Sequence, residues 1–264
     1  MDSDHTDPVT GLLAGKRLLI TGVARPDSIA FAVAERAQEA GAEIALGVFP
    51  RDLDAVEQLS ATLPRPPAAI VAVDATDPEQ LTALQDDLRA LFGHLDGALH
   101  AIAFAPAAAL QGIVGVPSSA VELALRTSTH SDAGLAQVVA DLAADRGASL
   151  VGLDFDPSRA WPVYNWMGPC KAALRSLNQY LARDLGPRGV RTNLVAAGPL
   201  RTRAAGGIPD FKVLLEAWER RSALPWNPDD ARPVADAVCF LLSDLARAIT
   251  GEILHVDGGT HAIQ

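Results

Sequence analysis

The sequence SLVGL at residues 149–153 is an apolar run typical of a buried strand, and YNWMGPCK at residues 164–171 follows it in a helical pattern. Apolar runs of this kind alternate with longer helical patterns along the chain, which is typical of stacked βαβ units around a parallel sheet. We therefore predict an α/β fold: a single Rossmann-like domain whose doubly wound parallel sheet has about seven strands and carries helices on both faces.

The individual strands and helices can be assigned from the same patterns. Strands are expected at residues 17–21, 43–48, 69–73, 97–100, 149–153, 191–195 and 252–256. Helices are expected near residues 29–40, 53–63, 78–91, 119–145, 163–185, 211–221 and 234–242. In such a sheet ligands bind beyond the carboxyl ends of the strands, so the residues that follow each strand are the candidates for a functional site.

Composition and charge narrow the class of protein. The chain has 264 residues, of which 49% are hydrophobic and 20% charged, and this suits one soluble globular domain with a sizeable core. Its net charge is −10 and no basic stripe is present, so nucleic acid is not an expected partner. No apolar run is long enough for a membrane-spanning helix, and the acidic N-terminus is unlike a secretory signal. We therefore expect a cytoplasmic protein without a membrane partner.

The N-terminus and the cysteines carry no functional signal. Residues 1–11 are polar and lack periodicity, so a disordered tail is expected there, with one domain over residues 12–264. Cys170 and Cys239 have no metal-binding or redox spacing and are interpreted as packing residues. No metal site is expected.

Tyr164 and Lys171 are the candidate catalytic pair. Seven positions on one helix are about two turns, so both side chains would project from one face. A phenol has a pKa of about 10, and a fixed ammonium nearby favours the phenolate, which makes the phenol a better proton donor to a developing oxyanion. The alternative interpretation is an amphipathic helix that carries a tyrosine and a lysine without catalytic purpose.

Two strand ends in the first part of the chain indicate a dinucleotide site. Gly22 follows the first strand where a close backbone approach is expected, and Ser28 can cap the next helix beside its free N–H groups. A pyrophosphate would bind there for the same reason. After the second strand, Phe49 could stack on adenine or belong to the core, and Arg51 leaves open a contact with a 2′-phosphate and therefore NADP.

Later strand ends add further candidates. Asp74, followed by Ala75, could accept from an adenine amino group or cap the helix that begins near residue 78. The small residues at 101–103 would let a ring or a ribose approach the backbone closely, unless they only pack the loop. The backbone of residues 197–202 could hydrogen-bond a carboxamide.

Taken together, these motifs resemble the short-chain dehydrogenase/reductase superfamily, and within it the enoyl-acyl-carrier-protein reductases of bacterial type II fatty-acid synthesis. The similarity runs over nearly the whole chain from about Gly11. DFDPSRA at residues 154–160, YNWM at residues 164–167 and NLVAAGP at residues 193–199 are close to the mycobacterial branch of this family. Six residues separate the tyrosine from the lysine, as in the enoyl reductases, whereas ordinary superfamily members separate the pair by three.

The resemblance implies a reaction and a cofactor. Tyr164 would hydrogen-bond the carbonyl of a trans-2-enoyl thioester while nicotinamide delivers a hydride to the β-carbon, Lys171 would hold the nicotinamide ribose, and Phe155 would orient the acyl chain. NADH is implied rather than NADPH, because Phe49 matches an aromatic residue beside adenine in the family. The residues implied at the cofactor are Gly22, Ser28, Ile29, Phe49, Asp74, Ala75, Ala101, Ile102, Ala103, Lys171, Gly198, Leu200 and Thr202.

The resemblance also implies partners: a thioester carried by acyl carrier protein or CoA, and further copies of the chain in a homotetramer. The segment of about residues 199–222 would bind the substrate, and its short loop indicates short or medium acyl chains. Residues 107–131 match the family less well and would line part of the acyl pocket. Arg203, where an apolar residue is usual, could meet a phosphopantetheine phosphate, an acidic carrier protein or water.

Ala101 and Pro50 are further departures from the family pattern, and two alternatives accompany this interpretation. Ala101 replaces a serine that is usual in the family, and the loss of one hydrogen bond, worth roughly 0.5–1.5 kcal/mol, predicts weaker NADH binding. The chain could be a paralogous NAD(P)H-dependent reductase that acts on a secondary-metabolite enone or imine. It could also be a catalytically silent NAD-binding protein, although Tyr164, Lys171 and Phe155 are all present.

Overall fold

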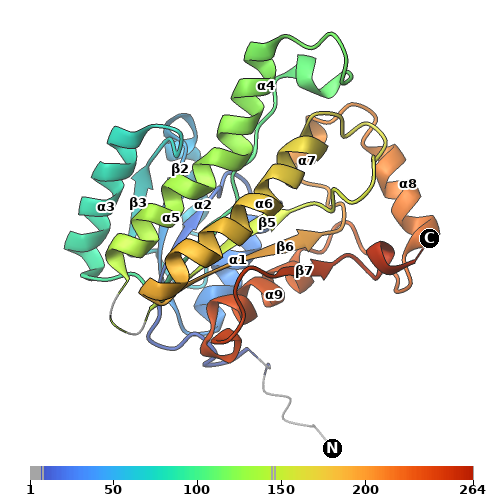
Figure 1. The fold of residues 1–264 in the computed structure, drawn as a ribbon. Helices are drawn as coiled ribbons and strands as arrows, with labels where there is room; N and C mark the ends of the chain where they lie inside the picture. Colours follow the sequence, from blue (N-terminus) through green and yellow to red (C-terminus); the bar gives the residue numbers. More distant parts are fainter. Residues whose placement is uncertain (1–6, 8, 144, 146, 264) are drawn as a thin grey trace, which may run out of the picture.

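One parallel sheet of seven strands organises the fold (Figure 1). The computed structural model describes residues 7, 9–143, 145 and 147–263. The strands follow the order β3-β2-β1-β4-β5-β6-β7, and every pair of neighbours is parallel. Their bounds are β1 Arg17–Thr21, β2 Glu43–Val48, β3 Ala69–Ala72, β4 Gly97–His100, β5 Ala148–Asp154, β6 Val190–Ala197 and β7 Ile253–Val256. The predicted fold class is confirmed.

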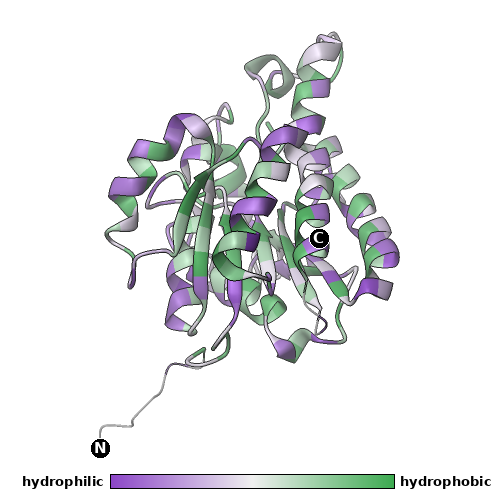
Figure 2. Ribbon diagram, turned by 90° about the vertical axis from the view of Figure 1, so that its left-hand side faces the viewer, coloured by the Kyte–Doolittle hydropathy of each residue, from purple (hydrophilic) through white to green (hydrophobic). Residues whose placement is uncertain are grey.

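Helices cover both faces of this sheet. α1, α2 and α9 contribute to the core on one face, and α3, α5 and α6 contribute to the core on the other. Figure 2 shows hydrophobic strands in the interior and hydrophilic residues along the outer sides of the helices. The bounds are α1 Ile29–Glu39, α2 Leu53–Ser60, α3 Pro78–Phe92, α4 Ser118–Leu125, α5 Ser131–Leu142, α6 Met167–Leu185, α7 Arg203–Gly206, α8 Lys212–Arg221 and α9 Arg232–Leu242. Within the described ranges, no helix has the length and apolar character needed to cross a membrane.

The strands are mostly apolar because both faces of the sheet are covered. In β1, Leu18 and Ile20 pack into the core beneath α1 and α9, whereas Leu19 packs into the core beneath α3 and α5. All three side chains are fully buried. Burial stabilises such a side chain by about 1.5–3 kcal/mol relative to exposure, so the alternation places β1 firmly between the two helical layers.

The switch point of the sheet lies between β1 and β4. These two strands are neighbours, and the strand order runs from them toward β3 on one side and toward β7 on the other. Gly22, directly after β1, has a φ of +82°, and a Cβ atom there would lie 2.1 Å from the Ala101 carbonyl oxygen after β4. Glycine is required because the two loops touch at the place where open α/β sheets bind ligands.

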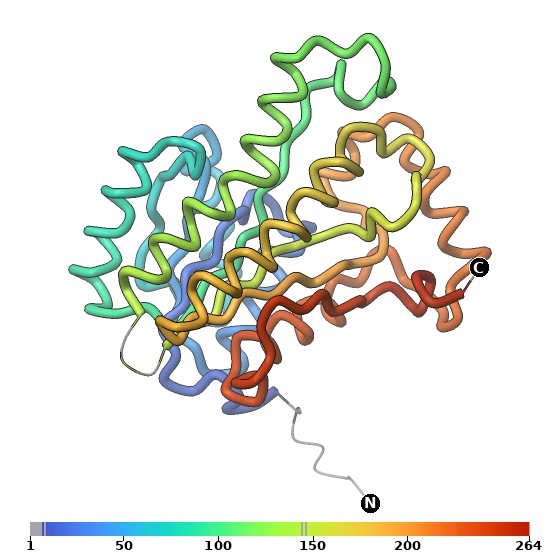
Figure 3. The backbone as a smooth tube through the Cα atoms, viewed as in Figure 1, coloured from blue at the N-terminus to red at the C-terminus, as the bar shows by residue number. Residues whose placement is uncertain are grey.

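The helix expected over residues 119–145 is three pieces: α4, a π-helical turn at Arg126–His130, and α5. In the turn, the Ser128 hydroxyl donates to the Phe104 carbonyl at 3.0 Å, and the Thr129 hydroxyl donates to the Cys170 carbonyl at 2.9 Å. These long-range hydrogen bonds join the turn to the loop after β4 and to α6. The backbone tube shows that α4 extends outward beyond the neighbouring helices (Figure 3).

The helix expected over residues 163–185 begins only at Met167, as α6. Val163 and Asn165 have φ values of +60° and +45°, in the left-handed region that a right-handed helix cannot contain. Tyr164 therefore lies in a turn before the helix. The prediction that Tyr164 and Lys171 project from one helical face is wrong.

The expected disordered tail over residues 1–11 is too long. Asp7 accepts two hydrogen bonds from the buried Arg36 guanidinium, at 2.5 and 2.7 Å, and Val9 belongs to the core. Arg36 also binds Glu39 and Asp236, so the beginning of the chain is attached to α1 and α9. Residues 1–6 and 8 of the expected tail lie outside the described residues.

Candidate active site

Tyr164 lies in the turn between β5 and α6, and the segment after β4 holds this turn in place. The Asn165 side chain donates to the Leu110 carbonyl at 2.7 Å. Tyr164 is 6% exposed, and its ring centroid lies 4.7 Å from that of Phe155. No described residue forms a hydrogen bond with the Tyr164 hydroxyl.

Lys171 reaches the same strand end from the beginning of α6. Its ammonium donates to the Leu153 carbonyl in β5 at 2.8 Å, and the residue is 5% exposed. Burial lowers the pKa of Lys171, and the carboxylate of Asp154 opposes this shift. Because Asp154 also acts on Tyr164, both candidate catalytic side chains lie near the end of β5 although they do not share a helix.

The structure does not support the expected lowering of the Tyr164 pKa by Lys171. Burial, followed by the negative charge of Asp154, raises the pKa of Tyr164 far above its usual value. Loss of solvation disfavours the phenolate, and the nearby carboxylate repels it. The phenol therefore stays neutral near neutral pH and can donate a hydrogen bond.

Sequence reasoning missed the charged residues beside this pair. Asp154 and Asp156 are buried, and Arg175 binds both. The Arg175 Nε atom donates to Asp154 at 2.7 Å, and its Nη1 atom lies 3.0 Å from Asp156. One feature of the sequence could have indicated Arg175. It follows Lys171 by one helical turn, which places the two cations on one face of α6.

Four aromatic rings, which we call the aromatic cluster, pack together beside the Tyr164 turn. They belong to Phe155, Trp161, Tyr164 and Trp218. The Phe155 and Trp218 centroids are 5.4 Å apart, and the Trp161 and Trp218 centroids are 4.7 Å apart. Leu110, from the segment expected to line an acyl pocket, belongs to the same apolar group. The aromatic cluster thus surrounds the Tyr164 ring with apolar side chains. Its two tryptophans were not predicted.

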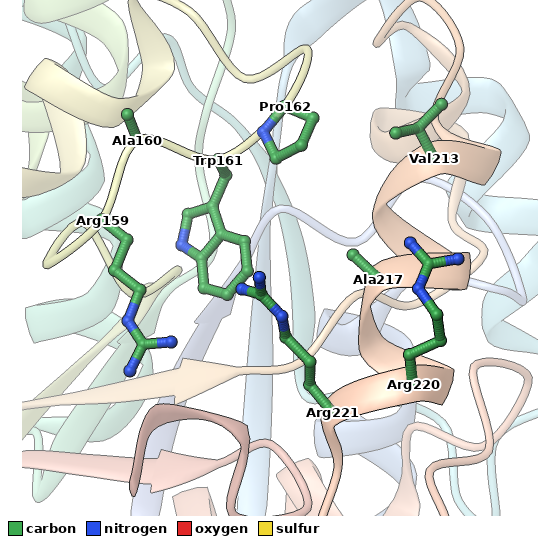
Figure 4. Close-up of a pocket in the computed structure, with 8 residues that line it drawn as sticks. All are labelled: Arg159, Ala160, Trp161, Pro162, Val213, Ala217, Arg220 and Arg221. Carbon is green, nitrogen blue, oxygen red and sulfur yellow. The ribbon is translucent and has the colours of Figure 1, made fainter. Parts of the chain in front are cut away.

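Trp161 also lines a hollow of about 280 Å³ (Figure 4). Arg159, Arg220 and Arg221 contribute to its lining, and we call it the arginine hollow. Arg159 donates to the Ile263 carbonyl at 3.3 Å. Within the described part of the chain, neither Arg220 nor Arg221 forms an ion pair, so the hollow gathers cations in a protein with a net charge of −10.

Ser28 caps α1, as predicted. Its hydroxyl oxygen accepts from the Phe31 N–H at 3.1 Å, and Ile29 is the first residue of the helix. The N–H groups of the first turn and the positive end of the helix dipole therefore lie beside Gly22 and the switch point. This arrangement is the one an anionic group such as a pyrophosphate requires.

Phe49 is 45% exposed at the end of β2, so its interpretation as a core residue is wrong. The Arg51 guanidinium lies 4.9 Å from the centre of the Phe49 ring, in a cation–π contact. The same guanidinium lies 3.6 Å from the Asp52 carboxylate. The ring is thus held at the surface by a neighbour of its own loop.

Asp74 and Ala75 follow β3, and Asp74 is not the cap of α3. That role belongs to Asp77, whose carboxylate accepts from the Glu79 and Gln80 N–H groups. One oxygen of Asp74 accepts from the N–H and the hydroxyl of Thr76, at 2.9 and 2.8 Å. Asp74 therefore stabilises a turn in the loop, and its interpretation as a helix cap is wrong.

The loop after β4 begins with Ala101, Ile102 and Ala103 and has no regular secondary structure. The Ala101 N–H donates to the Thr21 hydroxyl at 3.3 Å, which ties this loop to the end of β1. Ala103 is exposed and Ile102 is half-buried. The loop thus presents small side chains and accessible backbone at the switch point.

Gly198, Leu200 and Thr202 follow β6. A Cβ atom at Gly198 would lie 2.8 Å from the Trp218 indole nitrogen, so close packing requires glycine there. Leu200 is buried, and the Thr202 hydroxyl caps α7 by accepting from the Ala205 N–H at 3.2 Å. A short helix therefore occupies part of the segment that was expected to be a loop.

The predicted site residues share one edge of the molecule. Apart from Tyr164 in the turn before α6, Lys171 in α6, and Ser28 and Ile29 at the beginning of α1, they lie at or just beyond the carboxyl ends of β1 to β6. Strands of a parallel sheet all end at the same edge, which explains how residues far apart in the sequence meet there. No group of histidine, cysteine, aspartate or glutamate residues among those described could hold a metal ion.

Comparison with known proteins identifies the family. A family model described as enoyl-(acyl carrier protein) reductase matches residues 22–261. The chain belongs to this family. The enoyl-acyl-carrier-protein reductase (NADH) of Mycolicibacterium smegmatis is 42% identical to it over 266 residues, covering 95% of this chain and 98% of the relative. The protein of the same name from Mycobacterium avium is 42% identical over 265 residues, with the same two coverages.

A more distant member of the enoyl reductase family supports the same assignment. The Bacillus cereus enoyl-acyl-carrier-protein reductase (NADH) is 35% identical over 254 residues, covering 96% of this chain and 99% of the relative. The resemblance inferred from the motifs, including its mycobacterial branch, is confirmed by these matches.

Proposed function

We propose that this member of the enoyl reductase family reduces the carbon–carbon double bond of a trans-2-enoyl thioester with NADH. The observation that carries the proposal is a neutral, buried phenol without a protein partner among the described residues, placed beside an apolar aromatic cluster at the ligand edge of the sheet. A phenol in this state donates a hydrogen bond to a carbonyl oxygen whose negative charge grows during the reaction.

The residues at the sheet edge fit NADH. The capped beginning of α1 offers N–H groups to the pyrophosphate, and Phe49 offers an exposed ring to adenine. The other proposed contacts are Gly22, Ile29, Asp74, Ala75, Ala101, Ile102, Ala103, Lys171, Gly198, Leu200 and Thr202. When bound, the reduced nicotinamide supplies the hydride for the β-carbon of the thioester.

The chain's own residues would position and polarise the substrate. Tyr164 donates its hydroxyl to the thioester carbonyl and stabilises the enolate as charge reaches that oxygen. Lys171 holds the ribose hydroxyls with an ammonium that the Leu153 carbonyl and Asp154 already orient. Phe155 excludes water from the reacting carbons and aligns the acyl chain.

The carrier of the thioester would be recognised outside the aromatic cluster. The arginine hollow shares Trp161 with that cluster, and a guanidinium matches the geometry of a phosphate. We propose that the hollow receives a phosphate of the pantetheine arm of acyl carrier protein or CoA, while residues 199–222 bind the substrate. The short α7 segment favours short or medium acyl chains. A homotetramer and a cytoplasmic location stay predictions, to be tested by sedimentation velocity and cell fractionation.

A substrate panel tests the function. Purified protein is mixed with NADH or NADPH and with trans-2-enoyl thioesters of rising chain length, each on CoA and on acyl carrier protein. We expect NADH to be consumed faster than NADPH, with a saturated thioester as the product in mass spectrometry. Turnover of a conjugated enone or imine without any thioester turnover would select the paralogous reductase. Binding of NADH in calorimetry with no turnover of any substrate would select the silent protein.

Replacing Phe49 with alanine should weaken NADH binding. Stacking of a base on an aromatic ring is worth about 1–3 kcal/mol, so we expect the Kd for NADH to rise by at least about fivefold in calorimetry. The matched control is Tyr180→Ala, because Tyr180 is also an exposed ring with an arginine guanidinium over it, Arg183 at 4.7 Å, but lies on α6 away from the strand ends. Equal Kd values for both variants and the unmodified protein would exclude adenine stacking on Phe49.

A further inference from the structure

A buried histidine and a buried aspartate face each other within electrostatic reach of Lys171. His100 is the last residue of β4 and is 1% exposed, and Asp132 is the second residue of α5 and is 2% exposed. His100 Nδ1 lies 3.7 Å from Asp132 Oδ1. Neither of these two atoms has a hydrogen-bond partner within the described structure. Burying two polar atoms without hydrogen-bond partners costs folding free energy, so their position next to each other requires a physical explanation.

The hydrogen bonds of Ser131 determine the tautomer of His100. The Ser131 hydroxyl donates its single proton to the Thr127 carbonyl at 2.6 Å. It must therefore accept from His100 Nε2, which lies 2.8 Å away. A neutral His100 then carries its proton on Nε2 and directs the lone pair of Nδ1 toward Asp132.

A lone pair facing a carboxylate oxygen is repulsive unless a proton lies between them. Burial raises the pKa of Asp132 to about 7 and lowers the pKa of His100 to about 3. The proton of the pair therefore belongs to Asp132 when the pH is below about 7, and a protonated carboxyl can donate to Nδ1. If the two side chains move slightly closer, this one proton gives both Asp132 Oδ1 and His100 Nδ1 a hydrogen-bond partner.

The charged group that acts on this pair is Lys171. A Cβ atom at Gly152 of β5 would lie 3.7 Å from Asp132 Oδ1, and Gly152 precedes the residue whose carbonyl binds the Lys171 ammonium. Lys171 influences the pKa of both Asp132 and His100.

Lys171 is the charged group that acts on the pKa of Asp132; the π-helical turn packed on α5 carries Arg126 and His130, and neither contributes to that pKa. β5 ends in Asp154, and α6 adds the thiol of Cys170; both act on Lys171. α3 presents leucines to α5, with Leu81 beside Gly134 and with Leu84 and Leu88 in the shared core. Lys171 therefore has two carboxyl groups as its electrostatic partners, Asp154 and Asp132.

We propose that Asp132 and His100 are positioning residues that share one proton and control the charge of Lys171. When the pair releases this proton to water, the Asp132 carboxylate keeps the buried Lys171 ammonium protonated at alkaline pH, while His100 remains neutral. The effect on turnover depends on the proposed function; the shared proton itself does not.

The kinetic test replaces Asp132 with asparagine. Asparagine keeps the shape and can donate to His100 Nδ1, but it cannot ionise. Lys171 loses a carboxylate partner, so its already lowered pKa falls further, and the alkaline limb of the kcat/KM profile should move down by about one pH unit. The control is Asp141→Asn, an acid at the exposed end of the same helix. An unchanged alkaline limb in Asp132→Asn would overturn the proposed control of Lys171.

Nuclear magnetic resonance tests the shared proton without any turnover. In the unmodified protein labelled with ¹³C-aspartate and ¹⁵N-histidine, one buried carboxyl should titrate near pH 7 while His100 keeps the neutral Nε2–H tautomer throughout. Asp132→Asn should remove that titration. A charged His100, or the absence of a carboxyl that titrates near pH 7, would refute the pair even if Asp132→Asn failed to fold. If no thioester is reduced but the carboxyl titrates as expected, only the proposed function fails.

Discussion

Replacing Tyr164 with phenylalanine should lower kcat for enoyl thioester reduction by about 10²- to 10³-fold, the usual cost of removing one donor to a developing oxyanion. The loss should appear mainly in kcat, because the hydrogen bond strengthens as charge moves to the carbonyl oxygen. Steady-state rates with a fixed saturating NADH concentration measure it. The melting temperature should change little, because phenylalanine keeps the ring contact with Phe155 and the lost hydroxyl has no partner among the described residues.

The matched control for this variant is Tyr180→Phe, which removes a hydroxyl from an exposed ring on α6. It should leave both kcat and stability unchanged. A Tyr164→Phe enzyme whose kcat stayed within about threefold of the original would show that another group stabilises the enolate, and the proposed mechanism would then be wrong.

Replacing Arg175 with leucine should destabilise the protein by about 3–5 kcal/mol at neutral pH, the usual cost of removing one partner of a buried ion pair. Arg175 pairs with Asp154 and Asp156, whose side chains are 0% and 4% exposed, so two buried carboxylates would lose their cation. Urea denaturation at several pH values measures the change. The control is Arg183→Leu on the same helix, whose exposed pair with Asp184 should contribute no more than about 1 kcal/mol.

The effect of Arg175→Leu should shrink as the pH falls. Burial acts to raise the pKa of Asp156, but hydrogen bonds from Ser158 and the charge of Arg175 hold it below its usual value. A lowered carboxyl pKa contributes stability that is present above the unfolded value and is lost as the pH falls through the folded one. Without Arg175 this contribution is smaller, so the difference between the two proteins should be fully present near neutral pH and should shrink as the pH falls below about 4, the ordinary aspartate value, toward the lowered pKa of Asp156. A difference independent of pH would mean that packing, not charge, explains the loss.

Much of the fold was predictable because strands covered on both faces are mostly apolar and stand out from the helical patterns between them. β1, β2 and β4 begin and end where the pattern placed them, and the remaining strands differ by three residues or fewer in total length. The Ser28 cap was also predictable, because a serine before a helical pattern satisfies N–H groups that are adjacent in the sequence. These features depend on residues that are neighbours in the sequence, so one segment is enough to predict each of them.

The errors occurred where distant segments determine the backbone or the charge. The left-handed residues around Tyr164 are held by contacts with the loop after β4, which no helical pattern reveals. Asp7 looked like part of a tail because its partner Arg36 lies in α1. The pKa of Tyr164 moved opposite to expectation because its burial and the position of Asp154 are properties of the folded chain.

The sequence alone therefore predicted the parallel α/β fold, the edge of the sheet where a ligand is expected, and the candidate residues at that edge, because apolar periodicity and the residues after each strand are local signals. Only the tertiary structure decided how the site is built: Tyr164 in a turn, Lys171 on a helix, the Asp154–Arg175–Asp156 row beside them, and the buried His100–Asp132 pair. Electrostatic energy and solvation depend on distance and burial in space, and these are established only when β4, β5, α5 and α6 pack together.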